Sequence, residues 1–345
     1  MTRVLVVDDS AVVRKALTQE LARDPEIEVV GAAPDPYVAR ELIARTHPHV
    51  LTLDIDMPRM DGLTFLAKLM RHCPLPVIIV SSLTPRGSRM ALQALELGAI
   101  DVISKPESAY AVGDLGAQLA RTIKAAALID VRKLVPAAPA GPQLPIPPLR
   151  ASAHRIVAIG GSTGGTRAIA EIVSRFPANG PATLIVQHMP AGFTRAFAQR
   201  LDQLSAMTIR EARAGDTLES GLALVAPGDR HLAIGRSDDR TIAMLRDGPR
   251  VHFQRPSVEV LFDSVTETAG AEAVGILLTG MGADGAQGLL RMRRAGASTI
   301  AQDEATSVVF GMPREAILCG AAEQVLGLPA IADAALELSV RRRAA

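Results

Sequence analysis

The fold is decided by the stretch RIVAIGGSTGG, which covers residues 155–165. An apolar, β-prone run stops at two glycines, a single serine follows, and two more glycines come after it. Apolar residues then recur at helical spacing, at Ala168, Ile169, Ile172 and Val173. The stretch therefore predicts a strand, a sharp turn and a helix, with Ser162 in the turn.

Two interpretations of this turn are open from the stretch alone. The pattern Gly160-x-Ser162-x-Gly164 matches a nucleophile elbow, in which glycines let the backbone turn sharply and a substrate approach closely. The N-terminus of the following helix supplies free N–H groups and partial positive charge, which suit a developing oxyanion. The same features suit a loop that grips a phosphate in a nucleotide-binding unit.

The ends of two later strands favour the nucleophile. The strand predicted over 182–186 is followed, after one glutamine, by His188, and the strand predicted over 273–278 leads to Asp284. A dinucleotide site requires G-x-G-x-x-G and an acidic residue at the end of the second strand, and this sequence has neither. Ser162 and the two later residues are instead the parts of a nucleophile, a general base and an orienting carboxylate. Their order differs from the Ser, Asp, His order of the α/β-hydrolase fold.

Each member of this set also has a purely structural interpretation. A lone histidine at a strand end is more often a hydrogen-bonded structural residue, and His231 and His252 compete with His188 for the role of base. Asp284 also fits a turn or an N-cap position. The placement of all three side chains at strand ends is what favours catalysis.

The rest of the second half predicts a largely parallel, doubly wound α/β sheet with a small β-rich insertion. Strands are expected over 222–228, 231–234 and 298–301, and helices over 192–201, 257–268, 287–294 and 312–318. Two short strands, over 241–245 and 250–253, are expected to form the insertion.

Apolar strands alternate with helices throughout the first half, which predicts a doubly wound (βα)5 domain. Its continuous apolar strands are typical of a parallel sheet that is buried on both faces. The expected strands are 4–7, 29–32, 50–53, 77–80 and 101–104, and the expected helices are 12–21, 38–44, 63–70, 88–97 and 112–127.

Polar side chains gather where these strands end, at Asp8, Asp9, Asp54, Ser81 and Lys105. The site of an open α/β sheet lies outside the carboxyl ends of its strands. Carboxylates that converge there repel one another unless a cation lies among them, and hard oxygen ligands suit Mg²⁺ rather than zinc. A lone aspartate at a strand end is usually a helix cap, but the full set predicts a magnesium site.

Composition limits the class of protein. The chain has 345 residues, of which 48% are hydrophobic, so two domains with sizeable cores are expected. A net charge of +1 gives no sign of nucleic-acid binding, and no apolar window approaches the roughly 18 residues of a membrane span. The chain opens directly into a predicted strand, so no signal peptide is expected. Cys73 and Cys319 lack the spacing of metal ligands, so no cysteine metal site is expected. We therefore expect a cytoplasmic protein, and a monomer.

A proline-rich segment separates the two halves. Six prolines lie between Pro136 and Pro148, and hydrophobic periodicity is lost around them. Such a segment acts as a semi-extended tether. The predicted organisation is a first domain over 1–125, a linker over 126–152 and a second domain over 153–345.

The first half resembles the receiver domain of two-component response regulators at Asp8-Asp9, Asp54, Ser81 and Lys105-Pro106. The resemblance implies that Asp54 is the phosphoacceptor and that Asp8, Asp9 and Asp54 bind Mg²⁺. It also implies that Lys105 pairs with the phosphoryl oxygens and that Ser81 is the switch hydroxyl, although the next residue is also a serine. An aspartyl phosphate adds charge and acceptor oxygens, which can pull such a hydroxyl and its loop inward.

The second half resembles the catalytic domain of chemotaxis protein-glutamate methylesterases/protein-glutamine glutaminases. The motifs are GGSTGG at 160–165, QHMPAGF at 187–193, APGDRH at 226–231, RPSV at 255–258 and LTGMGADG at 278–285. That family has a receiver domain, a linker and an esterase domain in this order, so the resemblance covers essentially the whole chain. Carried over by position, it implies that Ser162, His188 and Asp284 form a catalytic triad. It also implies that Thr163 and the Met281 backbone N–H help to bind the oxyanion.

The resemblance implies phosphorylation-activated hydrolysis of glutamate methyl esters on methyl-accepting chemotaxis receptors, together with deamidation of receptor glutamines, which gives sensory adaptation. The implied partners are these receptors as substrate and a chemotaxis histidine kinase as phosphodonor. The implied cofactor is Mg²⁺ in the receiver domain, with none for the esterase reaction. The alternative is a non-enzymatic response regulator whose second domain binds a partner or a nucleotide.

Overall fold

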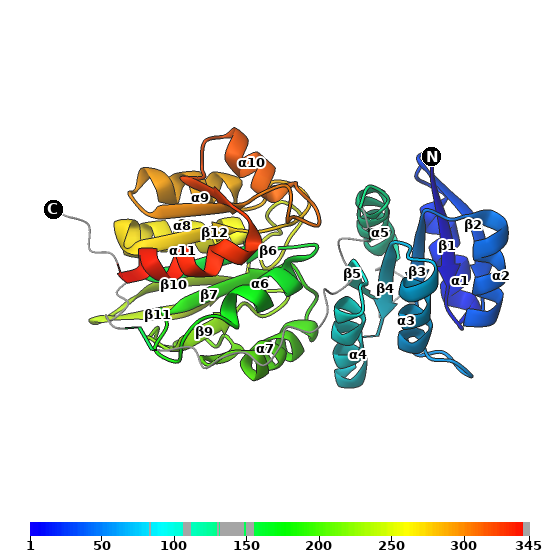
Figure 1. The fold of residues 1–345 in the computed structure, drawn as a ribbon, viewed down its shortest axis with the longest axis horizontal. Coiled ribbons are helices and arrows are strands. Elements are labelled where there is room, and N and C mark those ends of the chain that lie inside the picture. Colours follow the sequence, from blue (N-terminus) through cyan, green and yellow to red (C-terminus); the bar gives the residue numbers. More distant parts are fainter. Residues whose placement is uncertain (83, 106–111, 130, 132–147, 150–154, 341–345) are drawn as a thin grey trace. The chain divides into compact units, whose positions relative to one another are not determined.

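The computed structural model describes residues 1–82, 84–105, 112–129, 131, 148–149 and 155–340 (Figure 1). The chain divides into two compact units, Met1–Gly141 and Pro142–Ala345. Pro106 and most of the predicted linker lie outside the described residues, so the domain limits drawn from the sequence stay predictions. Among the helices that the structure describes, none combines the length and the apolar character that a membrane crossing requires.

The first unit is a parallel five-stranded sheet with the strand order β2-β1-β3-β4-β5. Every residue of β3 and β4 is buried, as expected for a parallel sheet that helices cover on both faces. The predicted alternation of strands and helices is confirmed. The elements are β1 (Thr2–Val7), α1 (Ala11–Leu21), β2 (Ile27–Ala33), α2 (Pro36–Thr46), β3 (Val50–Leu53), α3 (Gly62–His72), β4 (Val77–Ser81), α4 (Pro85–Glu96), β5 (Asp101–Ser104) and α5 (Val112–Ala126).

Polar caps determine where the helices of this unit begin. The Ser10 side chain accepts a hydrogen bond from the N–H of Val13, and the Asp35 side chain accepts two from the first turn of α2. Asp61 caps α3 in the same way. These residue types satisfy N–H groups that have no partner within the helix. The caps thereby set the lengths of the loops in which the strand-end carboxylates lie.

The second unit is a parallel seven-stranded sheet with the strand order β14-β13-β12-β6-β7-β9-β8, beside an antiparallel β10–β11 hairpin. This confirms the predicted doubly wound class. The strands are β6 (Ile156–Gly161), β7 (Thr183–Gln187), β8 (Thr208–Glu211), β9 (Leu222–Val225), β10 (His231–Ser237), β11 (Arg240–Arg246), β12 (Ala273–Leu277), β13 (Ser298–Gln302) and β14 (Gln324–Leu326). The helices are α6 (Gly165–Val173), α7 (Phe193–Leu204), α8 (Val258–Ala269), η3 (Gly270–Glu272), α9 (Ala286–Arg294), α10 (Met312–Leu318) and α11 (Leu328–Val340).

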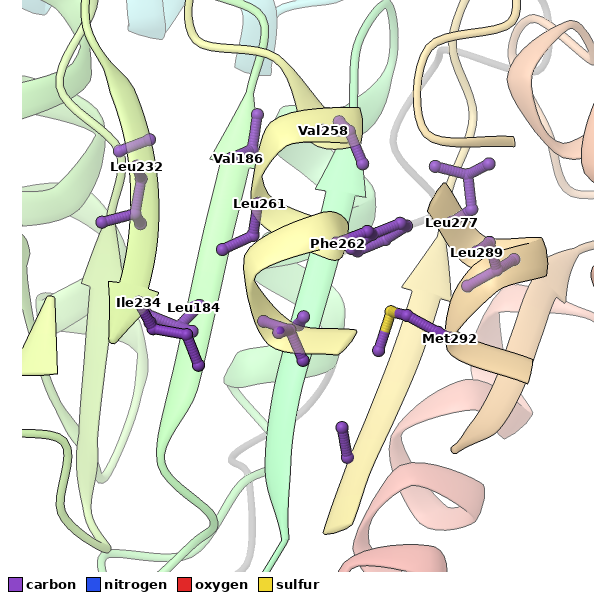
Figure 2. Close-up of a cluster of buried hydrophobic side chains, with 14 of the residues drawn as sticks. Leu184, Val186, Leu232, Ile234, Val258, Leu261, Phe262, Leu277, Leu289 and Met292 are labelled. Carbon is purple, nitrogen blue, oxygen red and sulfur yellow. The ribbon is translucent and has the colours of Figure 1, made fainter. Parts of the chain in front are cut away.

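Helix α8 lies at the site end of this sheet, and half of its residues are buried. It packs against α9 and the β10–β11 hairpin, whereas α6 packs against α7 and α11. Figure 2 shows Val258, Leu261 and Phe262 of α8 among the strand residues Val186 and Leu277, and all five side chains are fully buried. Each such burial stabilises the fold by about 1.5–3 kcal/mol. The packing therefore holds the N-terminus of α8 firmly beside the carboxyl ends of the strands.

The structure differs from the sequence expectation in four places. The edge strands β8 and β14 and the C-terminal helix α11 were not predicted. The segment 250–253 was expected to be a strand, and this is wrong. It forms instead a tight turn that is closed by a single antiparallel bridge between Val251 and Gln254.

Both sheets reverse their winding direction beside one strand. In the first unit, β1 pairs with β2 on one side and β3 on the other, and in the second unit β6 pairs with β7 and β12. Ligand sites of open α/β sheets lie at such switch points. In the first unit, the loops that follow β1 and β3 are therefore close to each other. In the second unit, the same holds for the loops that follow β6, β7 and β12.

Candidate active site

Ser162 follows β6 and stands in the turn that leads to α6. Its N–H donates to the Thr279 carbonyl at 3.0 Å, and its own carbonyl accepts from the Gly165 N–H at 2.7 Å. Gly164 has a φ of +80°, and a Cβ there would lie 2.6 Å from the Val308 side chain. Only glycine fits such a position. The strand, sharp turn and helix predicted for residues 155–165 are confirmed.

His188 follows β7, the strand beside β6. Its N–H donates to the Gly161 carbonyl at 3.1 Å, which continues the β6–β7 pairing by one step. Ser162 and His188 therefore lie at the same level on two adjacent strand ends. Both residues are almost fully enclosed, because the exposed fraction is 9% for Ser162 and 5% for the His188 side chain.

Asp284 holds the His188 ring. Nε2 of His188 lies 2.7 Å from Oδ2 of Asp284. An ionised carboxylate can only accept a hydrogen bond, so the proton of the neutral ring belongs on Nε2. Nδ1 of His188 is buried and has no hydrogen-bond partner among the described residues. Nδ1 is therefore the nitrogen that can accept a proton.

The Asp284 carboxylate accepts three further hydrogen bonds. The Ser257 hydroxyl donates at 2.7 Å, the Val258 N–H at 2.8 Å and the Glu259 N–H at 3.1 Å. The two backbone donors belong to the first turn of α8, where unpaired N–H groups and the helix dipole favour negative charge. Asp284 thus caps α8 from outside while it contacts His188.

These contacts keep Asp284 ionised. Burial disfavours its charged form, but the hydrogen bonds from His188, Ser257 and Val258 outweigh burial and hold the pKa of Asp284 below its ordinary value of 3.8. A carboxylate that stays charged can fix the tautomer of the imidazole and stabilise the imidazolium.

Two buried polar residues that support this arrangement had no role assigned from the sequence. The Gln187 side-chain amide donates to the Ser162 carbonyl at 2.8 Å and to the His188 carbonyl at 3.3 Å, so it ties the two turns together. Ser257 donates to Asp284 and does not cap its own helix. The place of Ser257 before an apolar helical run predicted an ordinary N-cap. For Gln187, the one sequence signal was its position next to His188.

The predicted oxyanion residues, Thr163 and Met281, lie in two loops that hydrogen bonds connect. The Thr163 carbonyl accepts from the Thr279 hydroxyl at 3.0 Å. Met281 lies two residues after Thr279. The residue between them, Gly280, has a carbonyl that accepts from the Met312 N–H at 2.8 Å. The loop that carries Met281 therefore borders the serine turn. The role of both residues in binding an oxyanion stays a prediction.

The two competing histidines have other surroundings. Nδ1 of His231 accepts from the Ser257 N–H at 3.2 Å, and Nε2 of His231 lies 3.0 Å from the Pro249 carbonyl, to which it donates in the neutral ring. Both nitrogens of His231 are thus engaged. His252 is exposed on the 251–254 turn. His188 is the one that stands on the strand end beside Ser162.

Gly280 packs directly on the serine turn, and this gives a first prediction. A Cβ at Gly280 would lie 2.6 Å from Cβ of Ser162 and 2.3 Å from Sδ of Met312. We expect Gly280→Ala to lower the free energy of unfolding by about 1–3 kcal/mol and to lower kcat, because Ser162 must move. Thermal unfolding and ester hydrolysis measure both effects. Gly248→Ala is the control, since its Cβ would meet His231 at an ordinary 3.8 Å. An unchanged kcat for Gly280→Ala would contradict the prediction.

The residues predicted for the first unit also converge. Asp8, Asp9 and Asp54 each offer a carboxylate oxygen, and these atoms lie within 4.8 Å of one another. Nζ of Lys105 lies 2.8 Å from Asp8 Oδ2 and 2.9 Å from Asp54 Oδ2. The Ser81 hydroxyl is buried without a hydrogen-bond partner among the described residues. Three hard oxygen donors in such a cluster fit the ligand preference of Mg²⁺.

The charges of this cluster are strongly coupled. Burial raises the pKa of Asp54 above its ordinary value, the like charge of Asp8 adds to the rise, and Lys105 opposes it. Burial alone would lower the pKa of Lys105, but its hydrogen bonds to the two carboxylates raise it. A carboxylate perturbed by burial and by a specific charged partner is typical of a functional site.

The two units therefore present two different kinds of site at the switch points of their sheets. Three carboxylates, a lysine and a buried hydroxyl are the features of a receiver that accepts a phosphoryl group. A serine, a histidine and an aspartate on three loops are the features of acyl transfer. Fold and sites together define a class of protein, a parallel α/β unit with the features of a serine esterase joined to a response-regulator receiver.

Comparison with known families agrees with this class. The response regulator receiver domain matches residues 4–112, and the CheB methylesterase family matches residues 157–335. The chain belongs to the CheB methylesterase family and is an enzyme with a receiver domain. The resemblance inferred from the sequence motifs is thereby confirmed.

Individual relatives match nearly the whole chain. A protein-glutamate methylesterase/protein-glutamine glutaminase of Syntrophus aciditrophicus is 52% identical over 333 residues, which are 96% of this chain and 97% of that protein. A relative of the same kind from Bordetella avium is 53% identical over 335 residues, with 96% and 95% covered. The fold also matches the crystal structure of the Thermotoga maritima CheB methylesterase catalytic domain, with a TM-score of 0.52 and 38% sequence identity. The match covers 53% of this chain and 98% of that domain.

Proposed function

We propose that the second unit hydrolyses the methyl esters of glutamate side chains in a protein substrate, with Ser162, His188 and Asp284 as its catalytic triad. The observation that carries the proposal is the 2.7 Å contact between His188 and Asp284, made on the strand end beside Ser162. The names of the relatives support glutamyl esters and glutamines of proteins as the substrates.

In the acylation step, Ser162 Oγ attacks the side-chain carbonyl carbon while Nδ1 of His188 takes the hydroxyl proton. Asp284 stabilises the imidazolium that forms. His188 then gives the proton to the methoxy oxygen, the C–O bond breaks and methanol leaves. The glutamyl group remains as an ester on Ser162.

In the deacylation step, His188 takes a proton from water as the water attacks the acyl carbonyl. The bond to Ser162 Oγ breaks, Ser162 regains the proton, and a glutamate side chain is released. A glutamine side chain can follow the same route with ammonia as the leaving group, which is the deamidation reaction. In both reactions, the backbone N–H groups near Thr163 and Met281 would stabilise the tetrahedral anion.

We infer that the first unit regulates this reaction through phosphorylation of Asp54. Asp8, Asp9 and Asp54 would hold Mg²⁺, which neutralises charge during phosphoryl transfer. Lys105, whose Nζ contacts both Asp8 and Asp54, would pair with the phosphoryl oxygens. The buried Ser81 hydroxyl is free to donate to them and would carry its loop along. A histidine kinase is the proposed phosphodonor, and methyl-accepting receptors are the proposed substrates.

Phosphorylation at Asp54 gives a second prediction. We expect a small phosphodonor such as acetyl phosphate to raise the rate of methanol release from methylated receptor membranes about 5- to 150-fold, the usual range of coupling between two sites. Asp54→Asn is expected to keep the low unphosphorylated rate and to lose the response, because an amide cannot form the acyl phosphate. Asp61→Asn is the matched control, since asparagine also caps a helix. Activation of Asp54→Asn by the phosphodonor would contradict the assignment.

A further inference from the structure

A groove lies between helices α2 and α3 of the first unit, outside both sites described above. Its volume is about 780 Å³. Helix α2 packs on β1 and β2, whereas α3 packs on α4, and the groove lies between these two packing groups. Ile43, Phe65 and Leu69 are buried residues that give the groove an apolar floor. An apolar hollow of this size on a surface is a candidate for binding.

Each helix presents one face to the groove. The lining positions have the spacing i, i+3, i+4 and i+7 on both sides, which is that of a single helical face. They are Arg40, Ile43, Ala44 and His47 on the side of α2, and Phe65, Lys68, Leu69 and His72 on α3. From Pro36 to His47 the groove follows α2 over about 16 Å, or roughly three helical turns. This length suits a helical segment of a partner, which places its apolar side chains at the same spacing.

The sides of the groove are basic. Two basic residues line each side and all four are exposed, namely Arg40 and His47 beside α2, and Lys68 and His72 on α3. Within the described part of the chain, none of these four side chains has an ion-pair or hydrogen-bond partner. Among the described residues, no aspartate or glutamate lines the groove. Charge complementarity therefore favours an acidic partner.

We propose that this groove is a docking site for an acidic amphipathic helix of a partner protein. The apolar stripe of that helix packs on the floor, and carboxylates on both flanks of the stripe pair with Arg40 and Lys68. A small carboxylic acid fits less well, because one charge cannot serve basic groups on both sides of the groove. The inference goes beyond the proposed function, since it requires neither the triad nor phosphorylation of Asp54.

The first test measures binding of a synthetic peptide to the full chain by fluorescence anisotropy. The peptide has about 14 residues, with leucines at i, i+3, i+4 and i+7 and glutamates on both flanks. A scrambled peptide of the same composition is the control. Cys73 is exposed and lines the groove, so its alkylation by N-ethylmaleimide locates the bound peptide. With the peptide at ten times its Kd, we expect Cys73 to react about 10-fold more slowly, by mass action, and Cys319 to react at an unchanged rate.

The second test uses variants of the groove. Arg40→Glu/Lys68→Glu is expected to raise the Kd of the peptide about 10-fold or more, because two attractive charge pairs become repulsive. Arg45→Glu is the matched control, since Arg45 is exposed on α2 but does not line the groove. Ala44→Trp places a bulky ring in the groove and leaves its charges intact, and it should weaken binding by a similar factor. Thermal unfolding verifies that each variant is folded.

Four outcomes would overturn the proposal. The first is equal binding of the scrambled peptide, and the second is binding without protection of Cys73. The third is an unchanged Kd in both Arg40→Glu/Lys68→Glu and Ala44→Trp. The fourth is dimerisation of the unaltered chain that Ala44→Trp abolishes, which would assign the groove to a second copy of the chain.

Discussion

Replacing Ser162 with alanine is expected to lower kcat for ester hydrolysis about 10⁶-fold, the loss seen when a serine hydrolase loses its nucleophile. Without Oγ, no acyl-enzyme can form, and the remaining groups can only bind and polarise the ester. The fold should be unaffected, because the turn is held by the backbone of Ser162, through its contacts with Thr279, Gly165 and Gln187. Methanol release from methylated receptor membranes measures the loss.

Two controls make this result specific. Phosphorylation of Asp54 by acetyl phosphate should persist in Ser162→Ala, which shows that the first unit is intact. Ser237→Ala removes an exposed hydroxyl at the end of β10 and should retain full activity. Methanol release by Ser162→Ala at the rate of the unaltered chain would rule out Ser162 as the nucleophile.

Asp284→Asn is expected to lower kcat about 10⁴-fold, the size of effect that follows when the orienting aspartate of a triad is changed to asparagine. An asparagine can turn its NH₂ group toward His188, which then presents the wrong tautomer. Alternatively, the NH₂ group faces the N–H donors of α8 at Val258 and Glu259 and loses those hydrogen bonds. Either orientation removes a negative charge that the imidazolium needs.

The same substitution predicts a dependence of stability on pH. Hydrogen bonds hold the pKa of Asp284 below its ordinary value of 3.8. An acid with a lowered pKa in the folded state contributes stability that is present above its ordinary pKa and is lost as pH falls through the lowered pKa. The gap in unfolding temperature between the unaltered chain and Asp284→Asn should therefore shrink below about pH 4. Asp239→Asn, at an exposed position, is the control, and a constant gap would contradict the account.

Much of the fold and of both candidate sites could be predicted because the chemistry sits at strand ends. Continuous apolar runs such as 4–7 and 273–278 identified the buried parallel strands. The residues after these runs must meet at one edge of each sheet. Asp54 and Asp284 were therefore recognisable as candidate site residues, while their contacts with Lys105 and His188 required the structure.

The 250–253 segment shows where local pattern fails. Its residues read as a short strand, and the turn dipeptides that signal a two-residue hairpin are missing. The Arg255 guanidinium donates to the Gly248 carbonyl and the Asp229 carboxylate, and the His231 ring contacts the Pro249 carbonyl, so tertiary contacts hold the segments on both sides of the turn. The signal lies in tertiary contacts, which a sequence pattern does not reveal.

Gln187 and Ser257 were missed as supporting residues for a related reason. Their hydrogen bonds join residues that are far apart in sequence, and the bond from Ser257 to Asp284 depends on how α8 packs over the sheet. The strands β8 and β14 were not predicted, because edge strands of only 4 and 3 residues carry too short an apolar pattern. Helix α11 carries an apolar face at Ile331, Ala335 and Leu338, which helical periodicity could have detected.

The most direct test of the central claim is methanol release from methylated receptor membranes by the unaltered full chain, measured with and without acetyl phosphate. The account predicts release in both states and a rate about 5- to 150-fold higher with the phosphodonor. No release in either state, with Asp54 phosphorylated normally, would contradict an esterase and favour a receiver protein whose second unit only binds a partner.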